Sequence, residues 1–332
     1  DLFRYPGIRS DSDLYTYGYD FKPWYGKPIA TGDQILHYLH EVVEEYNLEP
    51  HIRFGQRVAS AAWSTTGARW TVTTTNNEGE QSQFTGNFLL MCSGYYNYEA
   101  GHRPHFPGEE DFTGIIIHPQ AWPEELDYTG KHMVVIGSGA TAATVVPAVA
   151  DHVAHVVQLQ RSPSYYLPAD NSGNDDDLMK ELRALDLPQE WLYEIKRRKA
   201  LKEGRVFTAR ALNEPGVVRE ELLAMAAAIL PEGYDIQTHF TPRYDPWKER
   251  LCLLPNGDFL KAVASGKASV VTDTIERFVE DGILLQSGET LQADIIVTAT
   301  GIELCALGNI VFSVDDQPIH LPDTWTYRGI ML

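Results

Sequence analysis

The sequence predicts an α/β fold built around a parallel sheet. The chain has 332 residues, of which 43% are hydrophobic, and this length allows two domains with separate cores. Its middle reads as a buried strand, a glycine turn and a helix in "KHMVVIGSGATAATVVPAVA", followed by another strand in "HVAHVVQLQRS". Because neighbouring parallel strands need a crossover connection, this order predicts a βαβ unit.

The elements before the βαβ unit follow from hydrophobic periodicity. "ILHYLHEVVEEY" (residues 35–46) has apolar side chains at helical spacing, and Gly32 with Asp33 supplies a cap. "RWTVTTT" and "NFLLMCSG" are typical of strands, and a polar hairpin with Asn77 and Gly79 lies between them. We therefore expect a helix and two strands in this part of the chain.

The elements after the βαβ unit begin with a loop, "PADNSGNDDD" (168–177). It leads into helices from about residue 178 to residue 230, which we expect to be interrupted at Pro188, Gly204 and Pro215–Gly216. The basic run "KRRKALKEGR" within them could bind phosphate, but we favour a solvated helix face. Strands return in "ASVVTDTI", "RFVEDGILLQSGETL" and "ADIIVTATG".

Composition excludes several classes of function. The net charge of -19 argues against nucleic acid as a partner, because phosphate binding needs clustered cations. The longest apolar run, "LLAMAAAIL", is far shorter than the roughly 20 residues of a membrane span. Cys92, Cys252 and Cys305 form no C-x-x-C pair, so we expect buried thiols, no metal site and a reducing, cytoplasmic location.

The glycine turn predicts a Rossmann-like dinucleotide site. Gly137, Gly139 and Ala142 occupy the G-x-G-x-x-G/A positions between the predicted strand and helix. The first glycine permits the tight turn, the second lets the backbone approach a pyrophosphate, and the small alanine allows close helix packing. The helix N-terminus then faces the phosphates. The whole predicted turn consists of Gly137, Ser138, Gly139, Ala140, Thr141 and Ala142.

The end of the second strand indicates which dinucleotide binds. A site for NAD places Asp or Glu about 20 residues after the turn, where it bonds the ribose hydroxyls. Here the sequence has Gln160, Arg161 and Ser162. Arg161 offers a planar fork of donors for a 2′-phosphate, and Ser162 adds a hydroxyl. We therefore predict NADPH as the cofactor of this site.

A second motif, "FTGIIIHPQAWP", stands directly before the βαβ unit. Its residues Phe112, Gly114, His118, Trp122 and Pro123 match F-x-G-x-x-x-H-x-x-x-W-P, which resembles the fingerprint of Baeyer–Villiger monooxygenases. The related flavin-containing N- and S-oxygenases carry Tyr or Phe at the Trp position. Similarity in "YPGIRSD", "LQRSP", "LPEGYD" and "ADIIVTATG" extends along nearly the whole chain, and it is closest to the ethionamide-activating branch of mycobacteria.

The resemblance implies a flavoprotein with two dinucleotide-binding domains. Residues 1–119 are then a partial FAD-binding domain whose first βαβ unit is missing. Residues 120–297 form the inserted NADPH-binding domain, with a helical segment at about 170–235, and residues 298–332 return to the FAD domain. His118, a third expected catalytic residue, lies at the hinge near the nicotinamide, and Ala299, Thr300 and Gly301 match the second linker.

The resemblance also implies an activity and its catalytic residues. NADPH reduces FAD, O2 adds to give a C4a-peroxyflavin, and one oxygen atom is inserted into a ketone to give an ester or lactone. A fixed positive charge is needed beside the developing oxyanion. "ERLCL" assigns this role to Arg250, with Arg243 and Lys248 as alternatives, and "YPGIRSD" assigns Asp11 as the carboxylate that pairs with that arginine.

For FAD itself, the resemblance implies contacts from Arg9, Asp11, Val58 and Gly94. The sequence has no second G-x-G-x-x-G, so we expect the pyrophosphate turn for FAD upstream of Asp1. Both ends read as cuts within a larger protein, and we expect this chain alone to bind FAD weakly or not at all.

Two alternatives remain open. One is an N- or S-oxygenating flavin-containing monooxygenase, and the other is a truncated, inactive NADPH-binding fragment. The expected partners are O2 and a small ketone or sulfur compound, such as a thioamide or sulfide. The oligomeric state does not follow from the sequence.

Overall fold

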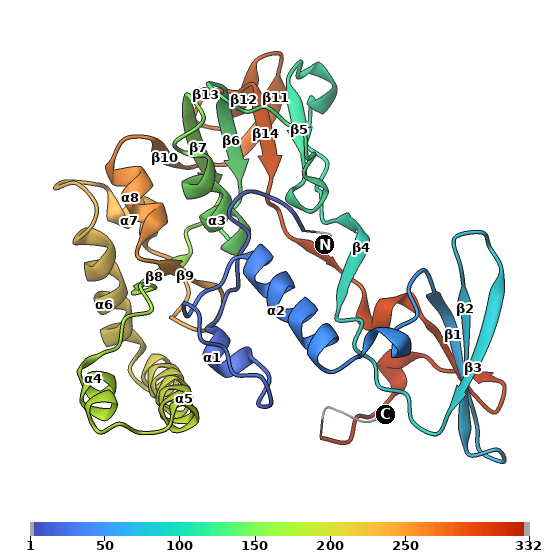
Figure 1. The fold of residues 1–332 in the computed structure, drawn as a ribbon. Coiled ribbons are helices and arrows are strands. Elements are labelled where there is room, and N and C mark those ends of the chain that lie inside the picture. The colour runs from blue at the N-terminus through green and yellow to red at the C-terminus, as the bar shows by residue number, and fades with distance from the viewer. Residues whose placement is uncertain (1–2, 329–332) are drawn as a thin grey trace. The chain divides into compact units, whose positions relative to one another are not determined.

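The computed structural model describes residues 3–328, which form two compact units. The first unit extends to Glu41 and resumes with His102–Gly301, and the second comprises Val42–Gly101 and the chain from Ile302 onward. The chain therefore passes between units within α2 (Gly32–Glu45), at Gly101 and at Gly301. Figure 1 shows the ribbon coloured along the chain.

A five-stranded sheet organises the first unit, and every strand pair in it is parallel. Its central strands are fully buried, since Met133, Val134 and Val135 have no exposed surface. This is the near-continuous apolar pattern expected of a parallel sheet covered on both faces. The predicted α/β fold with a βαβ unit is therefore confirmed (Figure 1). In spatial order the strands are β10 (Ala268–Thr272), β7 (His155–Gln160), β6 (His132–Ile136), β14 (Ile295–Thr298) and β5 (Ile115–Ile117).

Helix α3 (Ala140–Val149) is the crossover of the βαβ unit and packs against β6 and β7. Ala142 is fully buried, as expected for the small residue at the closest approach of helix and strand. Helix α8 (Asp258–Ala264) packs on α3 and follows β9 (Leu251–Pro255), which pairs in parallel with β8 (Tyr165–Ala169). Cys252, near the start of β9, lies beside the glycine turn, since its Sγ is 4.0 Å from the carbonyl oxygen of Ser138.

A three-stranded antiparallel sheet completes this part of the first unit. Phe278 is fully buried and meets Phe112 edge to face, with ring centroids 6.3 Å apart. The first residue of the fingerprint therefore serves packing. The strands are β11 (Ile275–Val279), β12 (Gly282–Leu285) and β13 (Thr290–Gln292).

The predicted helical segment is present, but its expected break at Gly204 is wrong. Helix α5 runs from Gln189 to Asn213 without interruption. Gly204 is exposed, and a glycine inside such a helix costs only about 1 kcal/mol relative to alanine, too little to end it. Within residues 3–328, no helix is long and apolar enough to span a bilayer. The other helices of this unit are α1 (Leu14–Tyr17), α4 (Asp177–Ala184), α6 (Pro215–Ala227) and α7 (Ile236–Phe240).

Helix α2 confirms the periodicity at residues 35–46, but its predicted cap is wrong. The capping residue is Thr31, whose Oγ1 accepts the N–H of Gln34 at 3.3 Å. In return, Oε1 of Gln34 accepts the N–H of Thr31 at 3.0 Å. This reciprocal T-x-x-Q capping box satisfies two otherwise orphaned donors, which Gly32 cannot do because it has no side chain.

The second unit contains a five-stranded sheet and a separate strand pair. The hairpin between the strands Arg69–Thr75 and Gln81–Gly86 contains Asn77 and Gly79, as predicted. The sheet order is β17 (Gln317–Pro318), β16 (Val311–Val314), β1 (Arg57–Ser64), β2 (Arg69–Thr75) and β3 (Gln81–Gly86), and the separate pair is β4 (Tyr96–Gly101) with β15 (Ile302–Leu304).

The strand predicted in "NFLLMCSG" is wrong. The strand that pairs with β2 is β3, which ends at Gly86, and residues 87–94 have no strand assignment. Phe88 and Leu90 are 90% and 83% exposed, so their alternation buries nothing within the described chain. Cys92 in this segment is exposed as well, which corrects the expectation of three buried thiols; Cys252 and Cys305 are buried.

Candidate functional site

The glycine turn has the geometry that a dinucleotide site requires. Gly137 has φ +134°, and a Cβ on it would lie 2.3 Å from the carbonyl oxygen of Ala299. Only glycine therefore fits between the turn and the neighbouring backbone. Gly139 caps α3 with an ordinary φ of -83°, and the nearest atom to a Cβ there is Cδ of Arg250 at 3.9 Å. The space in front of the α3 N-terminus is thus open to an anion.

A relay of buried hydroxyl groups joins this turn to Arg250. Oγ of Ser138 donates to the carbonyl of Ser162 at 2.9 Å. Oγ of Ser164 donates to Oγ of Ser138 at 3.1 Å, and Nε of Arg250 donates to Oγ of Ser164 at 3.2 Å. Ser138 is 7% exposed and Ser164 has no exposed surface. The relay fixes Arg250 through Nε and leaves both Nη groups without an ion pair or hydrogen bond among residues 3–328.

Asp11 and Arg250 line one cavity of about 170 Å³, together with Arg9, Cys252 and Thr144. The arginine and carboxylate assigned from the resemblance are therefore brought together, although no ion pair joins them within the described residues. Neither Arg243 nor Lys248 lines this cavity. Asp11 is partly exposed, but protein atoms crowd its carboxyl group and raise its pKa, while the charge of Arg9 opposes that rise.

Burial keeps two ionisable groups, the Cys252 thiol at this cavity and the neighbouring Tyr166 hydroxyl, in their protonated forms. It raises the pKa of the Cys252 thiol to about 12, and the nearby charge of Asp11 adds to the effect. The pKa of the neighbouring Tyr166 hydroxyl is also raised, chiefly by burial. Both groups stay protonated near neutral pH, so neither is a nucleophile. The charged groups that face the cavity are Arg9, Asp11 and Arg250.

Arg9 is bound by a residue that the sequence analysis missed. Its Nη1 forms an ion pair with Oδ2 of Asp258, and Nη2 makes a longer contact of 3.5 Å with Oδ1. The side chains are 14% and 29% exposed. Ser164 was missed as well. "LQRSPS" contains it two residues after Ser162, but its hydroxyl becomes informative only once the fold brings Arg250 to it.

His118 connects the fingerprint to the second predicted linker. Its Nδ1 accepts the N–H of Gln120 at 3.2 Å, so the proton is on Nε2, which donates to the carbonyl of Gly301 at 3.0 Å. Partial burial lowers the pKa of the imidazole and favours this neutral form. Nearby, Oγ1 of Thr300 donates to the carbonyl of His102 at 2.6 Å. The chain segments that leave and re-enter the first unit are thereby held together.

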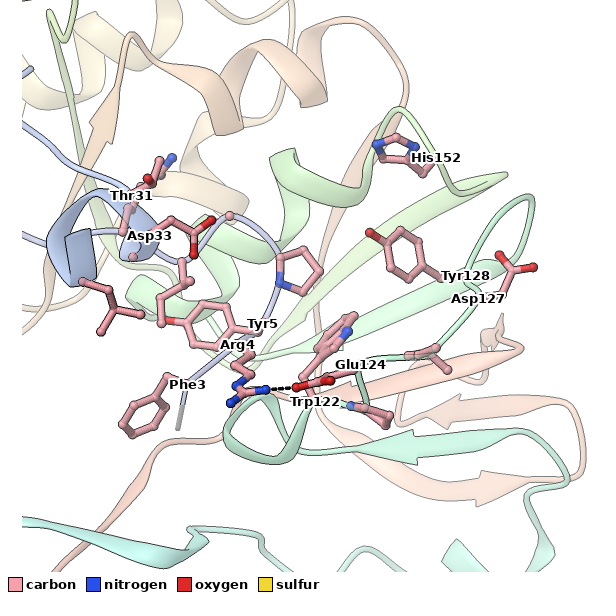
Figure 2. Close-up of a pocket in the computed structure, with 18 of the residues that line it drawn as sticks. Phe3, Arg4, Tyr5, Thr31, Asp33, Trp122, Glu124, Asp127, Tyr128 and His152 are labelled. Carbon is pink, nitrogen blue, oxygen red and sulfur yellow. Dashed lines mark ion pairs between the residues drawn. The ribbon is translucent and has the colours of Figure 1, made fainter. Parts of the chain in front are cut away.

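The end of the fingerprint lines a second, larger cavity of about 1160 Å³ (Figure 2). Trp122 and Pro123 face it, and Trp122 also meets the ring of Tyr128 edge to face at 6.1 Å. Arg4 and Glu124 form an ion pair across it. Gly114 has a different task, since a Cβ on it would lie 2.4 Å from the carbonyl oxygen of Asp294.

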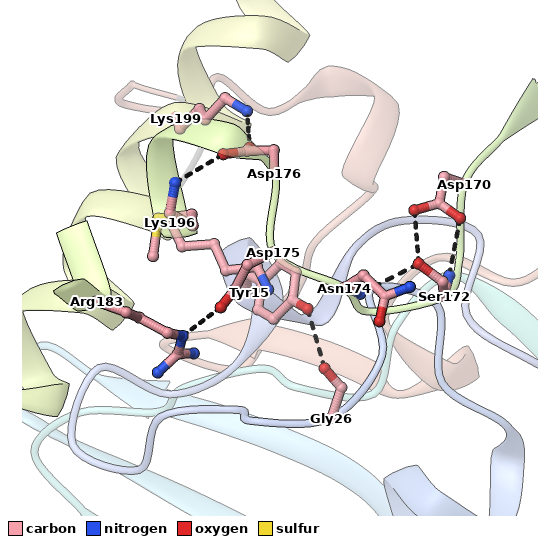
Figure 3. Close-up of polar contacts among 11 residues, drawn as sticks. Tyr15, Gly26, Asp170, Ser172, Asn174, Asp175, Asp176, Arg183, Lys196 and Lys199 are labelled. Atoms are coloured by element: carbon pink, nitrogen blue, oxygen red, sulfur yellow. Dashed lines mark hydrogen bonds and ion pairs between the residues drawn. The ribbon is translucent and has the colours of Figure 1, made fainter. Parts of the chain in front are cut away.

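Part of the basic run of α5 is paired with neighbouring carboxylates. Lys199 pairs with Asp176, and Lys196 lies 3.8 Å from Asp175. Arg183 of α4 also pairs with Asp175 (Figure 3). These cations tie the 168–177 loop to the helices, which fits the solvated helix face better than a phosphate patch.

Arg161 stands at the end of β7, exposed and without an ion pair or hydrogen bond among residues 3–328. Its guanidinium is thus available to an external anion, and Ser162 is half-buried beside it. Val58 on β1 and Gly94, with φ +71°, belong to the second unit. The assignments of these residues to NADPH and FAD stay predictions.

Replacing Arg161 by Ala should weaken NADPH binding by about 10- to 100-fold, because charge-assisted bonds to the 2′-phosphate are lost. NADH binding should change by less than about twofold, since NADH has no such phosphate. Titration with both nucleotides measures this, and the exposed Arg277→Ala on β11 is the control. Equal changes for the two nucleotides would show that Arg161 does not read the phosphate.

Comparison with known proteins places the chain among flavin enzymes. The flavin-binding monooxygenase-like family matches residues 18–195. The chain is 49% identical over 336 residues to the FAD-containing monooxygenase EthA of Mycolicibacterium smegmatis, and the match covers 100% of this chain and 67% of that relative. The predicted likeness to the mycobacterial branch is confirmed.

Solved structures share the fold. A steroid monooxygenase bound to NADP is 25% identical with a TM-score of 0.73, covering 94% of this chain and 66% of that one. A cyclohexanone monooxygenase bound to ε-caprolactone is 22% identical with a TM-score of 0.74, covering 98% and 70%. The predicted architecture with two dinucleotide-binding domains is therefore confirmed as a fold.

Proposed function

Because the chain belongs to the flavin-binding monooxygenase-like family, we propose that it acts as an FAD- and NADPH-dependent Baeyer–Villiger monooxygenase. In this reaction one oxygen atom of O2 is inserted into a ketone to give an ester or lactone. The observation that carries the proposal is the position of Arg250, which is held beside the glycine turn and lines one cavity with Asp11.

The enzyme uses FAD and NADPH, and the glycine turn fits the second of these. The backbone of Gly139 is open in front of α3, and Arg161 presents an unpaired cation among the described residues. We assign the pyrophosphate to the turn and the 2′-phosphate to Arg161. For FAD we retain Arg9, Asp11, Val58 and Gly94 as contacts. When bound, NADPH supplies a hydride and FAD the activation of O2.

Arg250 supplies the fixed positive charge that the chemistry needs. The bond from Nε to Ser164 fixes the direction of the guanidinium of this cavity-lining residue, and its Nη groups can donate to an oxygen that becomes negative. A charge oriented before the reaction stabilises a developing oxyanion without reorganisation at that moment. Asp11, which lines the same cavity, tempers the charge of the guanidinium. His118 positions the linker rather than transferring a proton.

Substrate oxidation by the flavin-loaded full-length protein tests the proposal. With cyclohexanone beside methyl phenyl sulfide, we expect lactone from the ketone at a rate above that of a boiled control, with one NADPH consumed per product. Mass spectrometry identifies the products. Sulfoxide without lactone would instead support the N- or S-oxygenating alternative. NADPH binding without turnover by residues 1–332 alone would support the inactive fragment.

A further inference from the structure

The ion pair between Arg9 and Asp258 joins two segments that both serve the cavity of Asp11 and Arg250. Arg9 lies two residues before Asp11, and Asp258 begins α8, just after the strand that follows Arg250. Oδ1 of Asp258 also accepts the N–H of Phe259 at 2.8 Å, so the carboxylate is fixed in place. The pair is mostly shielded from water, and its partners are 249 residues apart in the chain.

Two carboxylates compete for the guanidinium of Arg9. Asp258 holds it, while Asp11 lines the same cavity as Arg9, two residues further along the chain. The loop that carries both residues is anchored, because the N–H of Ser10 donates to the carbonyl of Ala30 at 2.9 Å. Among the described residues that line this cavity, Asp11 carries the one carboxylate, so without Asp258 it could neutralise a mostly buried Arg9, since an unpaired buried charge is costly.

We propose that Asp258 is a positioning residue for oxygenation: by holding Arg9, it keeps the carboxylate of Asp11 available to Arg250. The inference rests on the proposed function, because it assigns a purpose to the Asp11–Arg250 partnership. Asp258 touches neither substrate nor cofactor in this scheme and acts only through Arg9. Because Arg9 is also one of the residues assigned to FAD, all variants are compared per bound flavin. A simple structural brace between the loop and α8 is the competing explanation.

The two explanations rank variants of Arg9 in opposite orders. Arg9→Lys keeps a cation but loses the two-point contact with Asp258, so Asp11 captures more of it. Arg9→Gln removes the competing cation altogether. If Asp258 is a positioning residue, Arg9→Lys should give less product per NADPH consumed than Arg9→Gln. A brace predicts the reverse, because lysine can still pair with Asp258 and glutamine cannot.

Asp258→Asn is the direct test, made in the flavin-loaded full-length protein. We expect about tenfold less product per NADPH consumed, equivalent to ~1.4 kcal/mol, with the rate of NADPH oxidation unchanged. The double variant Asp258→Asn/Arg9→Gln should recover coupling to within about twofold of Arg9→Gln. Asp258→Glu, which keeps a carboxylate, is the conservative control.

Several outcomes would overturn the inference. These are normal coupling in Asp258→Asn, no recovery in the double variant, or better coupling in Arg9→Lys than in Arg9→Gln. The last comparison decides the matter even if Asp258→Asn does not fold. If Arg250→Ala couples normally, the proposed function itself has failed; if Arg250→Ala is uncoupled and Asp258→Asn is not, only this inference is wrong.

Discussion

Replacing Arg250 by Ala should lower ester formation by about 100- to 1000-fold, the range seen when a donor to a developing oxyanion is removed. NADPH oxidation should continue, with the electrons appearing in hydrogen peroxide. The reason is geometric. Arg250 is held by Ser164, beside the dinucleotide turn and within the cavity of Asp11, so its charge acts on the oxygenation step.

The structural cost of Arg250→Ala should be small. Arg250 is exposed, and its loss removes only one hydrogen bond accepted by Ser164. The Ser164 hydroxyl keeps its own donation to Ser138, so no buried donor is orphaned. A large loss of product with an unchanged melting temperature would therefore report on chemistry. Ester, hydrogen peroxide and NADPH are measured in the same reaction.

Matched controls separate Arg250 from the alternatives considered for its role. Arg243→Ala and Lys248→Ala remove exposed cations from the same segment, and neither side chain lines the cavity. Both should form ester at rates within about twofold of the parent. Arg250→Lys keeps a charge but not the planar fork, so we expect an intermediate loss. Normal ester formation by Arg250→Ala, with loss in Arg243→Ala, would move the role to Arg243.

Local signals account for what the sequence could predict. The strand, turn and helix at residues 132–149 lie within one short stretch, and its apolar strand, glycine turn and small helix residues agree with the fold, although Pro147 stands inside α3. Gly137, Gly139 and Ala142 could be assigned because their spacing has a steric reason that holds in any such turn. Arg161 could be placed because the end of β7 follows the turn at a fixed distance.

Sequence-based predictions fail where the local structure or the contact depends on residues that are distant in the chain. The alternation in "NFLLMCSG" is typical of a strand, but a strand also needs a partner, and none pairs with it within residues 3–328. Asp258 gave no signal, because an ion pair 249 residues apart leaves no periodicity or spacing in the chain. Thr31 was different. Its T-x-x-Q pattern is a local signal that indicates the capping box without any distant contact.

Substituting each of the two glycines of the turn by Ala should produce different failures. In Gly137→Ala, the new Cβ would lie 2.3 Å from a backbone oxygen of Ala299, which cannot move aside as a flexible side chain could. The φ of +134° is also strained for an L-residue, by roughly 1–3 kcal/mol. We expect the melting temperature to fall by about 5–10 °C and NADPH binding to be lost with the local structure.

Gly139→Ala should leave folding almost unchanged and still weaken NADPH by about 100-fold, or ~2.7 kcal/mol. Its φ of -83° suits alanine, and the nearest atom to the added methyl is 3.9 Å away. The free protein therefore has room for the methyl group, but a pyrophosphate at the α3 N-terminus does not. Thermal unfolding and NADPH titration of both variants measure the contrast. Unimpaired NADPH binding by a folded Gly139→Ala protein would mean that this turn does not hold the phosphates, because a methyl group in the path of the pyrophosphate cannot be harmless.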